Sequence, residues 1–557
     1  MTRKPKILMA TEASFLSTGF ANYTRELLTR LHATNKYDIA EFSAYGHVND
    51  PKDVGISWKY YANAVRPNDK RYQEYMSSAD NQFGRWRFDQ VVLDFKPDAV
   101  IDIRDYWMSN YEQFSSFRDF FHWILMPTVD SAPQQQTWLD TYESADAIFT
   151  YSDFGAKTLK QQTNDNVNYI ETVSPGIDLN TFFPETEENR QLLKQQMGIP
   201  VDSIIIGSVM RNQKRKLIPE LVKSFRITLD YYREKNPEIA DKMYLYLHTS
   251  FPDAGWDLPE ILKDEQVLNK TIITYNCEQC NNISPSNFVG PRAICPFCHN
   301  KTRIIPSVAQ GVSVETLRRI YSIMDIYVQY AICEGFGMPQ VEAAACGVPV
   351  ATVNYSAMED VVEKLEAYPI SIGSYFKELE TKAVRVYPDN QSLKNILIEF
   401  LNKTEKEKQD IRARTRALTE KHYNWENIAK KWQNYLDTIP SSEAKWGRPP
   451  NFLVPIDPNI CNENPHNINY MALMTSICIN NLKNIKLISS KRILNILQNL
   501  EYGYVQQGPN ARPYGLKQAV EELNIYIQNI NNSEKARTSN YKSQEDYIKY
   551  SKIKAST

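Results

Sequence analysis

Apolar and polar positions along this chain repeat as two successive series of strand-like and helix-like segments. The strand-like apolar runs of the first series lie at 6–12, 38–46, 98–105, 122–130 and 147–153. Those of the second series lie at 203–210, 242–250, 270–276, 325–331 and 348–353. Helix-like patterns follow the strand-like runs, and 14–33 after the first run is a loop that opens a long amphipathic helix. Strands that alternate with helices predict an α/β fold of two Rossmann-like, doubly wound domains.

The remaining segments set the expected domain organisation. Residues 49–85 show no clear period, and we interpret them as loop and short helix. We expect an N-terminal domain over 1–180, a second domain over 181–438 with an insertion at 277–305, and a C-terminal extension over 439–557. The extension begins with a Pro-rich stretch, continues with helical patterns and ends in polar residues, so we expect a mostly helical region whose role the sequence does not indicate.

Composition and charge narrow the classes of protein that the chain can represent. The 557 residues are 42% hydrophobic and 23% charged, which is typical of a globular protein with two to four domains. A net charge of −2 gives no overall attraction to nucleic acid or to an anionic membrane. The sequence has no apolar run of about 18 residues, the length that a membrane span needs. It also has no signal-peptide pattern, and its eight cysteines are unevenly spaced, so we expect a cytoplasmic protein.

The most informative motif is EGFGMPQVEAAACGVPV at 334–350. Glu334 lies next to a Gly335-Phe336-Gly337 turn that follows one predicted strand, and Glu342 lies eight positions later in a helical run. The glycines allow backbone N–H groups to approach a phosphate, and the start of the helix favours negative charge. Because eight residues span a little over two helical turns, the two carboxylates can contact different parts of one ligand.

This motif resembles the E-x7-E signature of retaining, GT-B-type nucleotide-sugar glycosyltransferases of the large family-four (glycosyl transferases group 1) kind. The resemblance extends over about 5–438 and implies two facing Rossmann-like domains with a ligand cleft between them. It implies that the second domain binds a nucleotide-diphosphate sugar, with Glu334 on the sugar hydroxyls, Glu342 on the ribose, and backbone amides near Phe336 and Gly337 on the phosphates. The alternative is an ordinary α/β crossover whose acidic residues face solvent.

A basic segment follows the first strand of the second series. Arg211 and Lys216 lie five positions apart there, and in the resembled family an Arg and a Lys at this spacing hold the donor diphosphate. The leaving group gains negative charge as the glycosidic bond breaks, so fixed cations stabilise it. Alone, this charge run fits a solvated surface, and we interpret the intervening Lys214 and Arg215 as positive potential or solvated side chains.

Two further positions belong to the expected site. Family members often carry a Gly-Gly pair after the first strand, whereas this chain has only Gly19, which we assign to donor binding with a tight turn as the alternative. Asp130 ends the predicted strand 122–130, at the edge where parallel sheets place their ligands. The expected catalytic residues are therefore Arg211, Lys216, Glu334 and Asp130.

The insertion carries a metal-binding pattern, Cys277-x2-Cys280-x14-Cys295-x2-Cys298. Two such pairs can enclose one tetrahedral Zn²⁺ with four thiolates. Because four thiolates leave no open position for water, the pattern predicts a structural zinc and not a catalytic one. The alternative, four free cysteines or disulfides, fits a cytoplasmic protein less well.

These expectations define one function and two alternatives. The resemblance implies a retaining glycosyltransferase that needs no catalytic metal and moves a sugar to a hydroxyl acceptor, by default a glycan. One alternative keeps the chemistry but takes a hydroxylated base in DNA as the acceptor, with the zinc ribbon and the extension as nucleic-acid-binding additions. The other is a catalytically silent GT-B scaffold that binds partners. The donor base, the donor sugar and the oligomeric state are not indicated.

Overall fold

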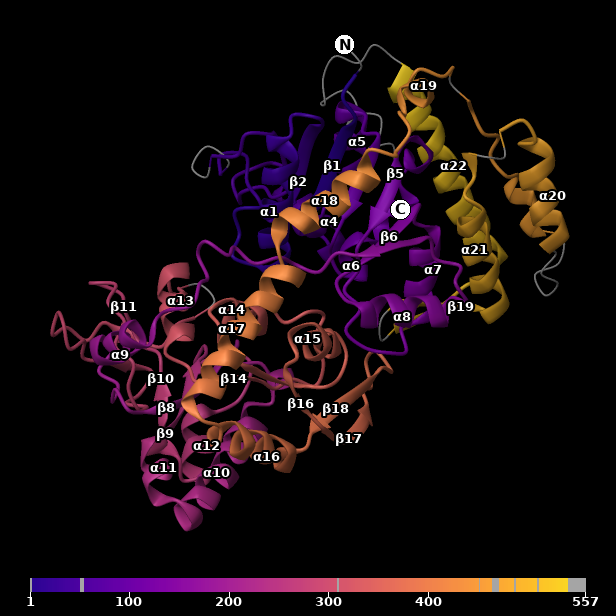
Figure 1. Cartoon of the computed structure of the whole chain (residues 1–557). Helices are drawn as coiled ribbons and strands as arrows, with labels where there is room; N and C mark the ends of the chain where they lie inside the picture. Colours follow the sequence, from indigo (N-terminus) through magenta and orange to yellow (C-terminus); the bar gives the residue numbers. More distant parts are fainter. Residues whose placement is uncertain are drawn as a thin grey trace. The chain divides into compact units, whose positions relative to one another are not determined.

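The computed structural model describes residues 3–50, 55–307, 310–449, 451–462, 470–484, 487–507 and 510–538 (Figure 1). The chain divides into two compact units. Unit 1 comprises 1–127, 140–148 and 434–557, and unit 2 comprises 128–139 and 149–433. These ranges differ from the domain boundaries expected at 180 and 438, which stay predictions.

The first sheet has seven strands in the order β3-β2-β1-β4-β5-β6-β7. They are β1 (Lys6–Glu12), β2 (Asp38–Ala44), β3 (Lys59–Ala62), β4 (Ala99–Asp102), β5 (His122–Leu125), β6 (Ala147–Thr150) and β7 (Tyr169–Thr172). Five of them coincide with the predicted apolar runs. The other two, β3 and β7, occur where no strand was predicted, and β3 corrects the interpretation of 49–85 as loop and short helix. Both are four-residue strands at the ends of the sheet, too short and too exposed to show a period of two.

The segments that connect these strands are mostly helical. They are α1 (Gly19–Ala33), α3 (Tyr72–Met76), α4 (Ala79–Phe83), α5 (Phe88–Phe95), α6 (Tyr106–Ser109), η1 (Asn110–Phe114), η2 (Arg118–Phe120), α7 (Gln136–Ser144) and α8 (Asp153–Gln162). Helix α1 starts where Thr18 caps it, because the Thr18 hydroxyl accepts a hydrogen bond from the Ala21 N–H over 3.2 Å.

The second sheet lies in unit 2 and has the order β10-β9-β8-β14-β15-β16. Its strands are β8 (Ile204–Val209), β9 (Met243–His248), β10 (Thr271–Ile273), β14 (Ile326–Gln329), β15 (Val350–Val353) and β16 (Tyr368–Ile370). Every predicted strand of the second series is present, and neighbouring strands pair in parallel. The core of the unit forms where α10 (Ile218–Lys235) and α16 (Asn390–Leu401) pack together and against the sheet.

The other elements of unit 2 complete its layers and its insertion. Besides α8, its other helices are α9 (Glu187–Gln196), η3 (Lys214–Lys216), α11 (Pro237–Lys242), α12 (Leu258–Asp264), η4 (Leu268–Lys270), α13 (Val314–Ser322), α14 (Met338–Ala345), α15 (Met358–Leu365), α17 (Glu405–His422) and α18 (Trp425–Leu436), whose end passes into unit 1. Two short antiparallel sheets add β11 (Asn276–Cys277), β12 (Arg292–Ala293) and β13 (Arg303–Ile304) in the insertion, and β17 (Ile372–Lys377) with β18 (Val384–Pro388) after β16.

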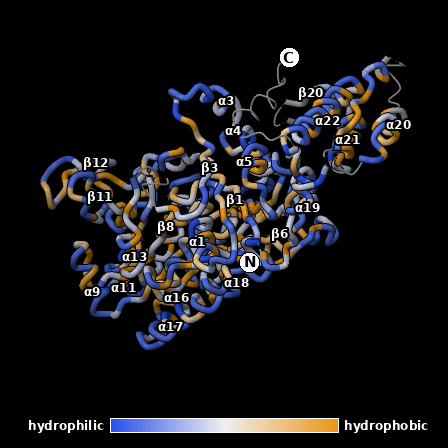
Figure 2. Tube along the Cα trace, turned by 90° about the horizontal axis from the view of Figure 1, so that it is seen from above, coloured by the Kyte–Doolittle hydropathy of each residue, from blue (hydrophilic) through white to orange (hydrophobic). Residues whose placement is uncertain are grey.

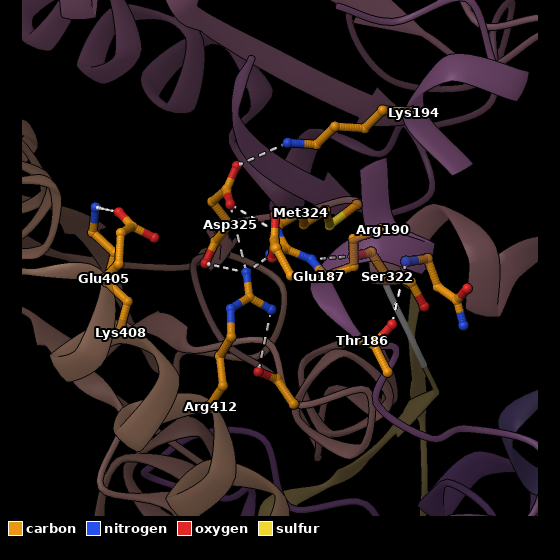
Figure 3. A network of polar contacts seen from close by, with 12 residues as sticks. Thr186, Glu187, Arg190, Lys194, Ser322, Met324, Asp325, Glu405, Lys408 and Arg412 are labelled. Carbon is orange, nitrogen blue, oxygen red and sulfur yellow. Dashed lines mark hydrogen bonds and ion pairs between the residues drawn. The ribbon is translucent and has the colours of Figure 1, made fainter. Parts of the chain in front are cut away.

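An ionic network around Asp325 joins three segments of unit 2 (Figure 3). Asp325 immediately precedes β14, and the side chains of Arg190, Lys194 and Arg412 point toward its carboxylate. Its oxygens lie 2.8 Å from Arg190 Nη2 and 3.7 Å from Lys194 Nζ, and one of them accepts the Ile205 N–H over 2.8 Å. Burial would raise the pKa of Asp325, but these cations outweigh it and lower the pKa to about 2. The network therefore fixes α9 and α17 to the start of β14.

The C-terminal extension is mostly helical, as expected, and has its own apolar core. Its elements are α19 (Glu443–Trp446), η5 (Pro458–Asn462), α20 (Tyr470–Asn480), α21 (Ser490–Tyr502), β19 (Tyr504–Gln507), β20 (Asn510–Pro513) and α22 (Leu516–Thr538). Figure 2 shows hydrophobic stretches in α20 and α21, coloured orange. Helix α22 continues through 533–538, the first part of the polar end, and 539–557 lie outside the described residues.

The extension packs against the rest of unit 1 through Trp446. The Trp446 ring lies 4.6 Å from that of Phe120 and 5.7 Å from that of Phe117, measured between centroids. Arg537 of α22 donates to the Trp446 carbonyl over 2.9 Å. Within the described ranges, no helix is both long enough and apolar enough to cross a membrane.

Candidate functional site

Glu334 lies in the loop that follows the carboxyl end of β14 and leads into α14. Gly337 caps α14 with φ 87°, a left-handed conformation that favours glycine. Gly335 is required for a different reason, since a Cβ built on it would lie 2.4 Å from Thr128 Cγ2. Phe336 is buried and its ring packs against Tyr423, so only its backbone remains for a ligand. The sequence therefore folds this loop tightly around the Glu334 carboxylate.

The Glu334 carboxylate is buried and held by two cations. Lys216 Nζ donates to Oε1, and Arg215 Nη1 donates to Oε2 over 3.0 Å. Gln329 Nε2 also donates to Oε1 over 2.9 Å. Burial alone would raise the pKa of Glu334, but the charges of Lys216 and Arg215 lower it below its ordinary value. Glu334 is therefore an ionised carboxylate at neutral pH with a fixed orientation.

The β8–α10 loop supplies these cations, with one difference from the sequence interpretation. Lys216 contacts Glu334, whereas Arg211 is half-exposed and forms a fork with Asp253, with N–O distances of 2.8 and 3.0 Å. Arg215, which we interpreted as potential or a solvated side chain, is the arginine that contacts Glu334. The sequence signal that could have identified Arg215 as a contact of Glu334 is that it directly precedes Lys216.

Glu342 lies on α14 and is hydrogen-bonded to a tyrosine. The Tyr321 hydroxyl donates to Glu342 Oε2 over 2.7 Å, and burial raises the pKa of the Glu342 carboxyl. Tyr321 belongs to α13 and was not identified from the sequence. The two glutamates of the motif thus have different environments. Glu334 contacts two cationic side chains, whereas Glu342 contacts the neutral hydroxyl of Tyr321.

Asp130 also lies in unit 2, beside the Glu334 loop. Arg385 of β18 forms an ion pair with its carboxylate at 3.0 Å, and the Cys333 thiol donates to it over 3.3 Å. Arg385 is in turn bound by Glu378 at 2.8 Å. The structure therefore brings Asp130 next to the residue that precedes Glu334, in a cluster whose other members the sequence did not indicate.

Gly19 belongs to unit 1, at the exposed start of α1. A Cβ built on it would meet no atom within 4 Å, so the fold does not require glycine at this position. The roles assigned to Gly19, to the basic residues and to the two glutamates stay predictions.

The four cysteines of the insertion gather at one point. Their sulfurs all lie within 4.8 Å of one another, and the pairs Cys277–Cys298 and Cys280–Cys295 are separated by 3.6 and 3.7 Å. A tetrahedral zinc with Zn–S distances of about 2.3 Å separates its sulfurs by about 3.8 Å. Backbone N–H groups of Gln279 and Cys280 point at Cys277 Sγ over 3.4 Å, which stabilises a thiolate. The donor set and its spacing fit a four-thiolate zinc.

Comparison with known proteins finds a family match for a segment in the second half of unit 2. Residues 307–418 match the family described as "Glycosyl transferases group 1". The D-inositol 3-phosphate glycosyltransferase of Nocardioides sp. (strain ATCC BAA-499 / JS614) is 23% identical over 220 residues, which are 40% of this chain and 41% of the relative. The chain thus spans about two-fifths of the length of that curated relative.

Solved structures share the fold over most of the chain. The sucrose-phosphate synthase from Thermosynechococcus elongatus matches with a TM-score of 0.55 at 16% identity, covering 78% of this chain and 98% of that structure. The Anabaena protein HepE, in complex with UDP and glucose, matches with a TM-score of 0.54 at 14% identity, covering 78% and 100%. The fold is therefore GT-B, and the expected fold class is confirmed.

Proposed function

We propose that this chain, which has the GT-B fold, is a group 1 glycosyl transferase that transfers a sugar from a nucleotide-diphosphate sugar to a hydroxyl acceptor. The observation that carries the proposal is the buried Glu334 carboxylate, which Lys216 and Arg215 hold at the carboxyl ends of β14 and β8. Ligands of parallel α/β sheets bind at such strand ends. The UDP bound to the neighbour HepE supports a nucleotide donor.

The residues of the loop have distinct roles in the proposed reaction. Arg211 and Lys216 bind the donor diphosphate and stabilise the charge that it gains. Glu334 accepts hydrogen bonds from the donor sugar, and Glu342 from the ribose. The bond from the anomeric carbon to the diphosphate oxygen breaks, and the acceptor oxygen bonds to that carbon on the same face. The acceptor proton passes to the departing phosphate oxygen. Because attack and departure occur on the same face, the anomeric configuration is retained. Asp130, beside Glu334, completes the catalytic set.

A donor screen tests this proposal. Thermal unfolding is measured with UDP-, GDP-, ADP- and CDP-sugars, with and without Mg²⁺. Selective stabilisation by one donor without Mg²⁺ supports the proposal and identifies the base. Transfer to glycan acceptors, followed by NMR of the new anomeric centre, then tests retention. An inverted product overturns the same-face mechanism, and the absence of stabilisation by every donor favours a silent scaffold.

Lys216→Ala should reduce transfer by about 10²–10³-fold, because the amine stabilises the leaving diphosphate. Steady-state kinetics measure this effect. Arg215 and Gln329 still hold Glu334 in the variant, so it should remain folded. Lys214→Ala removes an exposed lysine of the same turn and serves as the matched control. Transfer by Lys216→Ala at the rate of Lys214→Ala would contradict the assignment.

The cysteine cluster supports a structural zinc as the resident metal. Cys277, Cys280, Cys295 and Cys298 would hold it, and it would supply a crosslink between the strands of the ribbon rather than chemistry. Metal analysis of the purified protein should find about one zinc per chain. Chelation should lower the unfolding temperature, and double replacement Cys295→Ser and Cys298→Ser should abolish the zinc content. A wild-type protein that contains no zinc as purified, and whose unfolding temperature does not change on chelation, would refute the site.

A further inference from the structure

Arg211 is oriented by a single carboxylate. The Arg211 guanidinium donates two hydrogen bonds to the Asp253 carboxylate, from Nε over 2.8 Å and from Nη2 over 3.0 Å. Asp253 is itself fixed, because Ser250 Oγ donates to it over 2.5 Å and the Ala254 N–H over 2.7 Å. The Asp253 side chain is 8% exposed, whereas that of Arg211 is 46% exposed. The exposed Arg211 side chain is therefore held in one orientation by a buried carboxylate.

The loop 250–256, which contains Asp253, fits closely against the β8–α10 loop. Asn212 donates through Nδ2 to the Trp256 carbonyl over 2.8 Å, and its Oδ1 accepts the Trp256 N–H over 2.9 Å. Gly255 allows this approach, because a Cβ built on it would lie 2.3 Å from Asn212 Oδ1. The position of loop 250–256 therefore determines where Asn212 and its neighbour Arg211 lie.

The other side of this loop is supported by the cysteine-bearing insertion. The rings of Phe251 and Phe288 meet edge to face, with centroids 6.0 Å apart and planes at 78°. Phe288 lies between the two cysteine pairs in sequence. The segment that precedes Phe288 is anchored by Asn287, whose Nδ2 donates to the Thr271 carbonyl over 2.8 Å, and by the bridge between Ile273 and Ser286.

We propose that the zinc ribbon braces loop 250–256, and that Phe288, Phe251 and Asp253 are positioning residues that aim Arg211 at the donor diphosphate. Phe288 of the ribbon contacts Phe251, the backbone of loop 250–256 connects Phe251 to Asp253, and Asp253 contacts Arg211. The structural metal thereby controls anion affinity without touching the anion. The identity of the anion in this inference rests on the proposed function. The contacts between the ribbon and loop 250–256 do not depend on it.

The first test removes the brace without changing charge or metal. Phe288→Ala should keep its zinc, measured by metal analysis, and should weaken binding of UDP and of inorganic pyrophosphate by roughly three- to ten-fold in calorimetry. Val289→Ala, the neighbouring residue with a side chain that is 55% exposed, is the matched control and should bind as the wild type does. Equal affinities in the two zinc-loaded variants would overturn the brace.

Gly255→Ala tests the loop itself. The added methyl group must displace loop 250–256 from Asn212, so the affinity for both anions should fall as in Phe288→Ala. Gly311→Ala is the control, because a Cβ there meets nothing within 4 Å. Unchanged anion affinity in Gly255→Ala would contradict the inference.

Asp253→Asn separates positioning from competition. If Asp253 aims Arg211, the variant should bind pyrophosphate more weakly despite its lost negative charge. If Asp253 merely competes with the ligand for Arg211, the variant should bind more tightly, which would overturn the proposal. Asp253→Glu should recover part of the loss.

Amide hydrogen exchange makes the test independent of any ligand. Exchange across 250–256 should accelerate on zinc chelation and in Phe288→Ala, and not in Val289→Ala. Unchanged exchange in both cases would refute the brace even if the protein binds donors well. Faster exchange in a protein that binds no nucleotide sugar would instead support the brace and refute the proposed function.

Discussion

At the residue scale, sequence spacing located the loops of the site but not the direction of each side chain. Lys216 and Glu334 were expected in one site, and the structure brings them into contact. Arg211 was expected beside Lys216, yet it turns to Asp253 while Arg215 turns to Glu334. Arg211 precedes the single turn η3, whereas Arg215 lies within it beside Lys216, so the two arginines leave the loop at different points. A spacing of five residues carries no information on such a turn.

The partners that tune the carboxylates were also not predictable. Gln329 lies five residues before Glu334, whereas Tyr321 of α13 and Arg385 of β18 reach Glu342 and Asp130 through the tertiary fold. Each would be an unremarkable strand or helix residue in the sequence alone. The motif therefore predicted the two glutamates, whereas burial raises the pKa of Glu342, and the distant cations Lys216 and Arg215 outweigh burial and lower the pKa of Glu334.

Gly19→Ala is a residue-scale prediction about donor binding in unit 1. A Cβ at this exposed position meets no atom within 4 Å, so the unfolding temperature should not change. If the donor diphosphate approaches the backbone here, the added methyl group should raise the KM for the donor by about ten-fold, by analogy with other losses of one close contact. Kinetics and thermal unfolding of one variant decide the matter. An unchanged KM would identify Gly19 as a simple turn residue.

At the scale of elements, apolar runs predicted the central strands of both sheets. The missed strands β3, β7 and β16 are three or four residues long and stand at sheet edges, where half-exposure hides the pattern. The helices that join the strands were expected where amphipathic patterns are long. How α9 and α17 attach to the sheet was not visible, because attachment depends on Asp325 and cations that are far apart in sequence.

Asp325→Asn should destabilise unit 2 by about 3 kcal/mol, because it leaves Arg190, Lys194 and Arg412 without their shared carboxylate. The same group predicts a pH dependence. Its pKa is about 2 in the folded protein and near 3.8 unfolded, so its contribution is full above pH 3.8 and is lost as the pH falls toward 2. The loss amounts to about 2 kcal/mol.

Denaturant unfolding between pH 2 and 7 checks both statements about Asp325. Wild-type stability should fall more steeply between pH 4 and 2 than that of Asp325→Asn. Asp264→Asn, which changes an exposed acid of the same unit, should behave as the wild type does. If the free energies of unfolding of the wild type and Asp325→Asn change in parallel with pH, the Asp325 network does not cause the pH dependence.

At the scale of the whole molecule, the sequence predicted helices in the extension but not what they pack against. Trp446 lies in the Pro-rich stretch that begins the extension, yet the residue is 7% exposed and its ring packs on Phe117 and Phe120. These contacts join residues more than 300 positions apart, a relation that no local pattern encodes. Arg492 adds a second contact, with its guanidinium carbon 4.5 Å from the centre of the Phe114 ring. The extension is thus an integral part of unit 1.

Trp446→Ala should therefore destabilise unit 1 by about 3–5 kcal/mol, because it opens a cavity over two buried phenylalanines. Phe452→Ala, which changes an exposed aromatic residue of the same extension, should cost far less. Because the carboxylates and cations of the proposed donor site belong to unit 2, donor affinity at a temperature where both variants are folded should match the wild type. Thermal unfolding and calorimetry with the identified donor measure the two effects. A variant of normal stability with weakened donor binding would instead assign the extension a direct part in the reaction.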